Sequence, residues 1–240
     1  MNNHLQQRDR GLLRIGAVSG VLGVVAALVQ AAIDPSYADD AGEAIQQASL
    51  SNLLTFSRVL DMTAFLLLLV GVTTITKVFA DGPGAPWGRL GRTLFTVSAA
   101  AGAIATMIVG SFPSIAEEWA DAPPALKPGY VAVYDALDHL SGSVFTVSWA
   151  SLGIFGIVFA VALGRSGIFS RTLAGISAAS GVALVSALVV GIGFQLDAAF
   201  LLLVLGLLLS YVVVVAASVK VWRLAGRPVP GPALVADSVG

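Results

Sequence analysis

Residues 56–71 read FSRVLDMTAFLLLLVG, and this stretch decides how the chain can fold. It lies in a largely apolar run that extends from Leu53 to Phe79. A helix rises 1.5 Å per residue, so about 20 apolar residues cross the roughly 30 Å hydrocarbon core of a bilayer. The run is therefore predicted to be a transmembrane helix, and Arg58 and Asp61 lie near one of its ends.

The composition of the whole chain agrees with this interpretation. Of its 240 residues 57% are hydrophobic and only 11% are charged, with a mean hydropathy of +0.89, whereas about a quarter of the residues of soluble domains are charged. The sequence predicts an all-α, polytopic transmembrane helix bundle in one domain, residues 1–228, followed by a flexible cytoplasmic tail, 229–240. The six predicted spans are residues 12–33, 53–79, 93–115, 140–163, 172–195 and 198–221.

Several function classes are disfavoured by composition. The chain has no cysteine, so disulfides, thiolate metal sites and cysteine nucleophiles are excluded. Its two histidines, His4 and His139, are too few for a zinc or haem site, and we expect no metal and no cofactor. A net charge of −1 gives no basic field that would recruit nucleic acid. The expected partners are the lipid bilayer and a small-molecule or lipid ligand.

The distribution of Lys and Arg predicts the orientation. With both termini in the cytoplasm, 11 of the 13 basic residues lie on the inner side, and only Arg58 and Lys127 lie outside. Most acidic residues fall on the outer half. An alternative is that the first span is a signal peptide cleaved near residues 29–31, but its apolar run is longer than usual for such a segment. We therefore expect an uncleaved first helix and a multi-pass protein of the cell inner (plasma) membrane.

Small residues suggest how the helices pack. Spans 93–115 and 172–195 are rich in Ala, Ser and Gly, which allow close helix approach in lipid, and are predicted at the centre of the bundle. Span 198–221 is bulky all round and is predicted to face lipid. Residues 92–102 match residues 171–181 at seven of eleven positions, which suggests an internal repeat that also places Asp61 on Asp138. Chance similarity between alanine-rich helices is the alternative.

Arg58 and Asp61 form the first candidate site. They are three residues apart on one helix face, so they can pair, and Asp61 lies about 24 Å from Lys77, near the outer edge of the core. One interpretation is an interfacial ion pair that sets the height of the helix. The other is the lining of a binding site, because ionisable residues within spans usually face the bundle interior or a wet cavity.

Asp135, Asp138 and His139 form the second candidate site. Asp135 and His139 are four residues apart, so they share a helix face, and a carboxylate beside an imidazole suits acid–base chemistry or cation binding. The alternative is that both aspartates only stabilise a helix N-terminus. Beside this site, the segment SIAEEWADAPPALKPGY, residues 114–130, is predicted to contain a short surface helix.

Residues 153–185, GIFGIVFAVALGRSGIFSRTLAGISAASGVALV, carry a resemblance. A helix ends in small residues and an Arg-Ser-Gly turn, and an aromatic residue, an arginine and the next helix follow. In this arrangement, and in its layout from the second span onward, the chain resembles a bacterial family of six-helix membrane proteins described as a domain of unknown function. The resemblance implies six spans and a bacterial inner membrane, and no activity.

Three functional hypotheses follow from these residues. The first, which we favour, is a binding or transport protein whose outward vestibule takes a small polar or cationic solute at Arg58, Asp61, Asp135, Asp138 and His139. The second is an intramembrane enzyme acting on a lipid or isoprenoid, with Asp61 or Asp138 as proton donor and His139 as its partner. The third is a non-catalytic membrane subunit or assembly factor, in which the charges only position helices.

Overall fold

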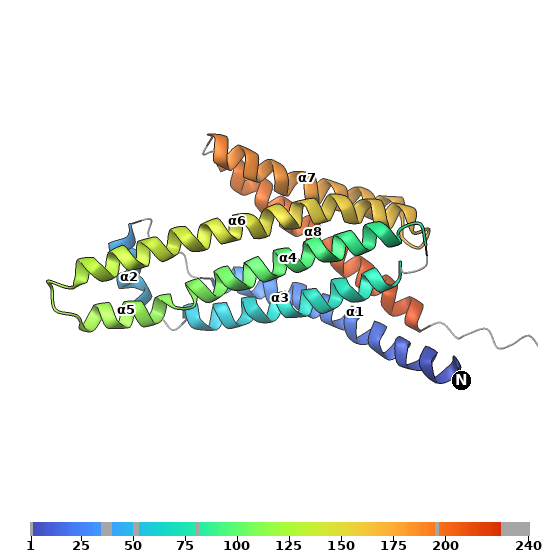
Figure 1. Cartoon of the computed structure of the whole chain (residues 1–240), viewed down its shortest axis with the longest axis horizontal. Coiled ribbons are helices and arrows are strands. Elements are labelled where there is room, and N and C mark those ends of the chain that lie inside the picture. The colour runs from blue at the N-terminus through green and yellow to red at the C-terminus, as the bar shows by residue number, and fades with distance from the viewer. Residues whose placement is uncertain (1, 35–39, 50–52, 80–81, 195–196, 227–240) are drawn as a thin grey trace, which may run out of the picture.

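The structure, a computed structural model, describes residues 2–34, 40–49, 53–79, 82–194 and 197–226 (Figure 1). The predicted tail, 229–240, lies outside these residues. The described residues form helices and no strand, and six helices are long and apolar enough to cross a membrane. This confirms the all-α, multi-pass bundle. The helices are α1 (Asn2–Ile33), α2 (Ala41–Ser49), α3 (Leu53–Lys77), α4 (Ala85–Val109), α5 (Phe112–Asp121), α6 (Lys127–Arg165), α7 (Arg171–Phe194) and α8 (Asp197–Ala225).

The six spans form a closed ring. Each contacts the next in the order α1, α3, α4, α6, α7, α8, and α8 returns to α1. The prediction that spans 93–115 and 172–195 lie at the centre is therefore wrong: the apolar windows of α4 and α7 are each 39% buried, no more than those of α1 and α3. The low burial of α8, 17%, agrees with its predicted lipid-facing position.

Glycines bring neighbouring spans close together. The small residues therefore mediate contacts between adjacent helices of the ring. Gly156 on α6 faces Gly181 on α7, where an added Cβ on Gly156 would lie 2.9 Å from the Gly181 Cα. Gly20 and Gly71 make a similar contact between α1 and α3. Such close backbone approach is the usual way in which helices associate in lipid.

Prolines account for the differences between predicted and observed helix ends. α4 begins at Ala85 and α6 at Lys127, well before the predicted starts at 93 and 140. Pro86 and Pro128 occupy the first turns of these helices. A proline is tolerated there because the first turn needs no N–H for an intrahelical hydrogen bond, and its fixed φ suits a helix.

The predicted span 93–115 ends early for a related reason. α4 stops at Val109, and α5 begins at Phe112 with Pro113 in its first turn. Pro113 cannot donate to the carbonyl of residue 109, so the α-helical ladder is interrupted between the two helices. The short surface helix predicted within 114–130 is α5, which begins at Phe112, two residues before that segment, and ends within it at Asp121.

α6 is much longer than a span. Its 39 residues extend over about 58 Å, nearly twice the hydrocarbon thickness. Its first part projects at one end of the bundle beside α2 and α5 (Figure 1), and these three elements pack around Ile45, Phe112, Ala116 and Tyr134. We call this the acidic end, because its three helical elements carry Glu43, Glu117, Glu118, Asp121, Asp135 and Asp138. The opposite, basic end is where Lys77 and Arg165 terminate α3 and α6 and Arg171 begins α7.

Candidate functional site

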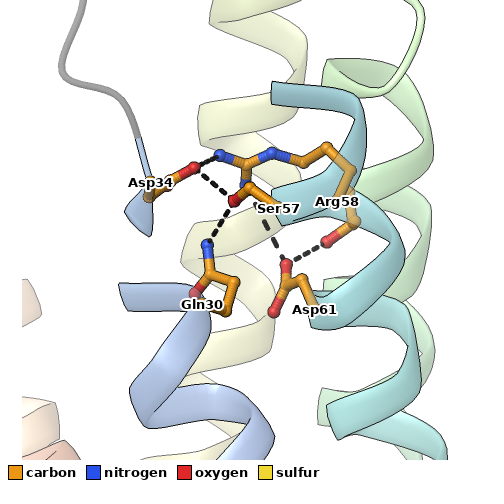
Figure 2. Close-up of polar contacts among 6 residues, drawn as sticks. Gln30, Asp34, Ser57, Arg58 and Asp61 are labelled. Carbon is orange, nitrogen blue, oxygen red and sulfur yellow. Dashed lines mark hydrogen bonds and ion pairs between the residues drawn. The ribbon is translucent and has the colours of Figure 1, made fainter. Parts of the chain in front are cut away.

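A network of polar side chains joins α1 to α3 at the acidic end (Figure 2). Asp34, directly after α1, accepts hydrogen bonds at Oδ1 from Arg58 Nη2 and from Ser57 Oγ, the latter at 2.6 Å. Gln30 Nε2 donates to Ser57 Oγ at 3.3 Å. The side chain of Arg58 is only 13% exposed and that of Asp34 31%. The guanidinium is therefore held in place by the end of the neighbouring helix.

Asp61 extends the network from α3 to α4. Its Oδ2 accepts a 2.6 Å hydrogen bond from Thr106 Oγ1 and lies 4.0 Å from Arg58 Nη1. The Asp61 side chain is 14% exposed. Both contacts use Oδ2, so among the described residues Oδ1 has no hydrogen-bond donor or cation assigned to it.

Asp34, Arg58 and Asp61 form what we call the charge cluster. When all three are ionised, two carboxylates and one guanidinium leave a net charge of −1. Removing charges from water is costly unless hydrogen bonds compensate, and the hydroxyls of Ser57 and Thr106 provide part of that compensation. Arg58 Nε is buried and has no hydrogen-bond partner among the described residues. The charge cluster is thus only partly compensated by the protein itself.

A cavity of about 360 Å³ adjoins the charge cluster inside the ring of spans. Residues from α1, α3, α4, α6 and α8 line it, including all three members of the cluster. Most of the remaining lining is apolar. Its aromatic side chains are Phe65, Phe95, Phe145, Trp149, Phe155 and Tyr211. The cavity therefore combines an aromatic interior with a charged group at the acidic end.

Helical spacing explains why these side chains converge. On α6 the lining residues each lie three or four residues from another of the set, the spacing of one helix face; they are Phe145, Ser148, Trp149, Leu152 and Phe155. Ser148 Oγ donates to the carbonyl of Ser98 on α4 at 2.8 Å, and Ser210 on α8 bonds to Ser180 on α7 at 2.6 Å. These serines already form hydrogen bonds between helices. The polar groups that can bind a ligand in the cavity are therefore mainly those of the charge cluster.

The structure separates the two predicted groups of site residues. Arg58 and Asp61 line the cavity, whereas Asp135, Asp138 and His139 do not. Asp138 lies 27 residues before the basic end of α6, or about 40 Å, against about 24 Å for Asp61 on α3. It is exposed on the part of α6 that projects beyond the spans.

Asp135 and His139 form an exposed pair of their own. His139 Nε2 lies 3.6 Å from Asp135 Oδ1. The His139 side chain is 81% exposed and the Asp135 side chain is 56% exposed. The exposure of both groups leaves their charges well screened by solvent.

The suggested repeat is visible in the contacts of two aligned serines. Ser98 and Ser177, equivalent in the alignment, both contact α6: Ser98 through Ser148, and Ser177 through a 2.8 Å hydrogen bond to the carbonyl of Gly156. The aligned aspartates differ, because Asp61 lies inside the ring and Asp138 is exposed. The repeat therefore does not bring two equivalent carboxylates to one site.

Several residues of the site did not stand out in the sequence. Asp34 precedes Pro35 at the end of the first predicted span, and Ser57 and Thr106 are isolated hydroxyls in apolar runs. One signal was available: Ser98, Ala99 and Thr106 fall on a single face of α4, together with Phe95. That face could have been matched with the one that carries Asp61 on α3.

Within the part of the chain that the structure describes, no three His, Asp or Glu side chains gather as a metal site would require. No protein-family model matches the chain, and comparison with curated proteins and with solved structures finds no match.

Proposed function

We propose that this protein is a membrane-embedded binding or transport protein whose cavity takes an amphiphilic cation. The charged group of the ligand lies at the charge cluster, and its apolar body lies among the aromatic side chains. One observation supports this proposal above the others: a mainly apolar cavity of about 360 Å³ is bounded at one end by Asp34, Arg58 and Asp61.

The charge of the cluster favours a cation over an anion. Arg58 is already contacted by carboxylates on two sides, so an incoming anion would meet the carboxylates as well as the guanidinium. A cation is attracted by the net charge of −1 and has Asp61 Oδ1 as an acceptor. Aromatic faces add to this, since a cation near Trp, Tyr or Phe gains about 0.5–2 kcal/mol, and Trp149 and Tyr211 both line the cavity.

The interior narrows the expected ligand from a small polar solute to an amphiphile. A strongly hydrated solute would lose its water and find few polar partners beyond the charge cluster, at a cost of several kcal/mol. Ligand sites in proteins are typically apolar cavities with a few placed polar groups. The lining here has that character, with the charged groups at one end.

The enzyme hypothesis is weakened by the same arrangement. It paired Asp61 or Asp138 with His139, but neither Asp138 nor His139 lines the cavity. Asp61 keeps a hydroxyl partner, Thr106, and a guanidinium partner, Arg58. For the subunit hypothesis, in which the charges only position helices, the cavity has no role.

A pair of probes with one shape and opposite charges tests the proposal. Tetraphenylphosphonium and tetraphenylborate are measured by equilibrium dialysis against the purified, detergent-solubilised protein, with empty micelles as the blank. We expect saturable binding of the cation and at least tenfold weaker binding of the anion. Equal binding of both would leave only a hydrophobic cavity. Transport is then measured as uptake of tetraphenylphosphonium into proteoliposomes. Uptake above that of protein-free liposomes would show that the protein transports the cation as well as binding it.

The orientation and the membrane belong to the same proposal. The asymmetry of Lys and Arg supports cytoplasmic termini, and with that orientation the charge cluster lies on the outer side. The resemblance to the bacterial six-helix family supports the inner membrane. A ligand that enters from outside, or from the outer leaflet, is then the one that meets Asp34 and Asp61 first.

A further inference from the structure

A second, smaller pocket lies at the basic end, on the opposite side of the bundle from the charge cluster. It measures about 240 Å³ and is lined by Thr76 and Lys77 at the end of α3 and by Ala85, Arg89 and Arg92 at the start of α4. Among the described residues of this lining three are cations and none is acidic. The proposed function does not use this pocket.

The three cations have no ionic partner among the described residues. Asp81, the one acidic residue between Lys77 and Arg92, lies outside those residues, and with it included the segment still carries a net charge of +2. Other arginines at this end are engaged with aromatic rings: Arg14 lies 5.5 Å from the centroid of Trp222, and Arg165 lies 5.4 Å from that of Trp87. Lys77, Arg89 and Arg92 are therefore available for an anion.

An apolar stripe runs along the outside of α4 and begins in the helical turn that carries Arg89 and Arg92. Leu90, Val97 and Ile104 follow at intervals of seven residues, so they share one helix face, and they are 47%, 46% and 53% exposed. In a membrane protein such a face lies against acyl chains. Leu90 lies in the same turn of α4 as Arg89 and Arg92, about 100° around the helix from Arg89. A molecule with an anionic head and apolar chains can therefore place its head at the cations and a chain along the stripe.

We propose that Lys77, Arg89 and Arg92 form a binding site for the phosphate group of an anionic phospholipid, whose acyl chains lie along Leu90, Val97 and Ile104. Basic pockets between transmembrane helices are known to take anionic lipid headgroups. Arg suits this role because its planar guanidinium donates two parallel hydrogen bonds to a phosphate. A free phosphate ion could make the same contacts with the three cations as the phosphate group of a lipid. The apolar stripe favours the lipid, because only the lipid has acyl chains that can lie along it.

Native mass spectrometry of the purified protein tests this site. The protein is exchanged into micelles that contain phosphatidylglycerol and phosphatidylcholine, and the adducts of each lipid are counted. We expect the wild type to retain phosphatidylglycerol selectively. Each cation removed weakens retention by roughly fivefold, and Lys77→Gln/Arg89→Gln/Arg92→Gln together by on the order of 100-fold.

The control removes the same number of charges elsewhere at the basic end, as Arg171→Gln/Lys220→Gln/Arg223→Gln. We expect it to lower retention less than threefold. Equal losses in both triple variants would show general electrostatic attraction and overturn the site. Displacement of the lipid by 10 mM inorganic phosphate would also overturn it, in favour of a soluble ligand. The charge-preserving variant Arg89→Lys/Arg92→Lys, expected to keep most of the selectivity, and the single variant Arg89→Gln guard against loss through misfolding.

Discussion

Arg58, in the second turn of α3, donates a hydrogen bond to the carboxylate of Asp34 at the end of α1, and its other terminal nitrogen faces Asp61 one turn further along its own helix. One guanidinium thus lies between two carboxylates of different helices, 13% exposed. This arrangement both fixes the end of α1 against α3 and leaves a surplus negative charge beside the cavity. Its structural and its binding roles can be tested separately.

Replacement of Arg58 by Gln tests the structural role. The change leaves Asp34 and Asp61 beside each other without their counter-charge, and we expect a destabilisation of about 2 kcal/mol. The apparent melting temperature in detergent should fall by several degrees. Asp135→Asn is the control, because that carboxylate is 56% exposed and its ionic partner among the described residues is an exposed histidine. A similar melting temperature for Arg58→Gln and the wild type would show that the cluster does not hold α1 to α3.

Close packing of α6 on α7 is tested with one substitution at two positions of α7. In Gly181→Ala the new Cβ would lie 2.5 Å from the carbonyl oxygen of Gly153 and 2.7 Å from the backbone nitrogen of Ile157, so the helices must move apart at a cost of about 1–3 kcal/mol. Gly175→Ala meets no atom within 4 Å and should stabilise the helix slightly, because Ala is the better helix former. Thermal unfolding that ranks Gly175→Ala at or below Gly181→Ala would contradict the packing.

The location of the ligand can be tested without changing any charge. Ala99 lines the cavity and is 6% exposed, whereas its neighbour Ala100 is exposed on the outside of α4. Ala99→Leu adds three carbon atoms to the cavity wall and should lower tetraphenylphosphonium binding at least tenfold. Ala100→Leu should bind as the wild type does. If both variants bind equally well, the cation lies elsewhere on the protein.

The absence of cysteine makes the orientation directly measurable. A single cysteine introduced as Asp138→Cys lies on the projecting part of α6, and one introduced as Arg223→Cys lies in the last turn of α8. With cytoplasmic termini, a membrane-impermeant maleimide should label the first in intact cells and the second only after permeabilisation. The reverse pattern would place the charge cluster on the cytoplasmic side.

Hydropathy was sufficient to predict the six spans, because a run of about 20 apolar residues has few alternatives to a transmembrane helix. It could not predict where the helices begin and end. Pro86, Pro113 and Pro128 each occupy the first turn of a helix, and a proline in a sequence indicates a helix boundary without saying on which side the helix lies. For this reason the length of α6 was underestimated, and Asp138 was expected near the membrane.

The site was predictable only in part. The spacing of Arg58 and Asp61 identified a pair on one face of a span, and the structure places both residues in the cavity lining. Their partners Asp34 and Thr106 come from the two neighbouring helices. Such contacts depend on which spans are adjacent in the ring, and small-residue content pointed to a different arrangement. Cavity shape depends on the same adjacency, so the sequence alone could not indicate it.

The proposed binding of an amphiphilic cation is tested most directly by replacing aspartate with asparagine at two positions, one in the cavity and one outside it. Asp61→Asn removes the negative charge that faces the cavity, and Asp138→Asn removes one from the exposed part of α6. Equilibrium dialysis of tetraphenylphosphonium against the purified proteins gives the dissociation constants. We expect Asp61→Asn to bind at least tenfold more weakly than the wild type, and Asp138→Asn to bind equally well. Unchanged affinity in Asp61→Asn, or equal losses in both variants, would contradict the proposed site.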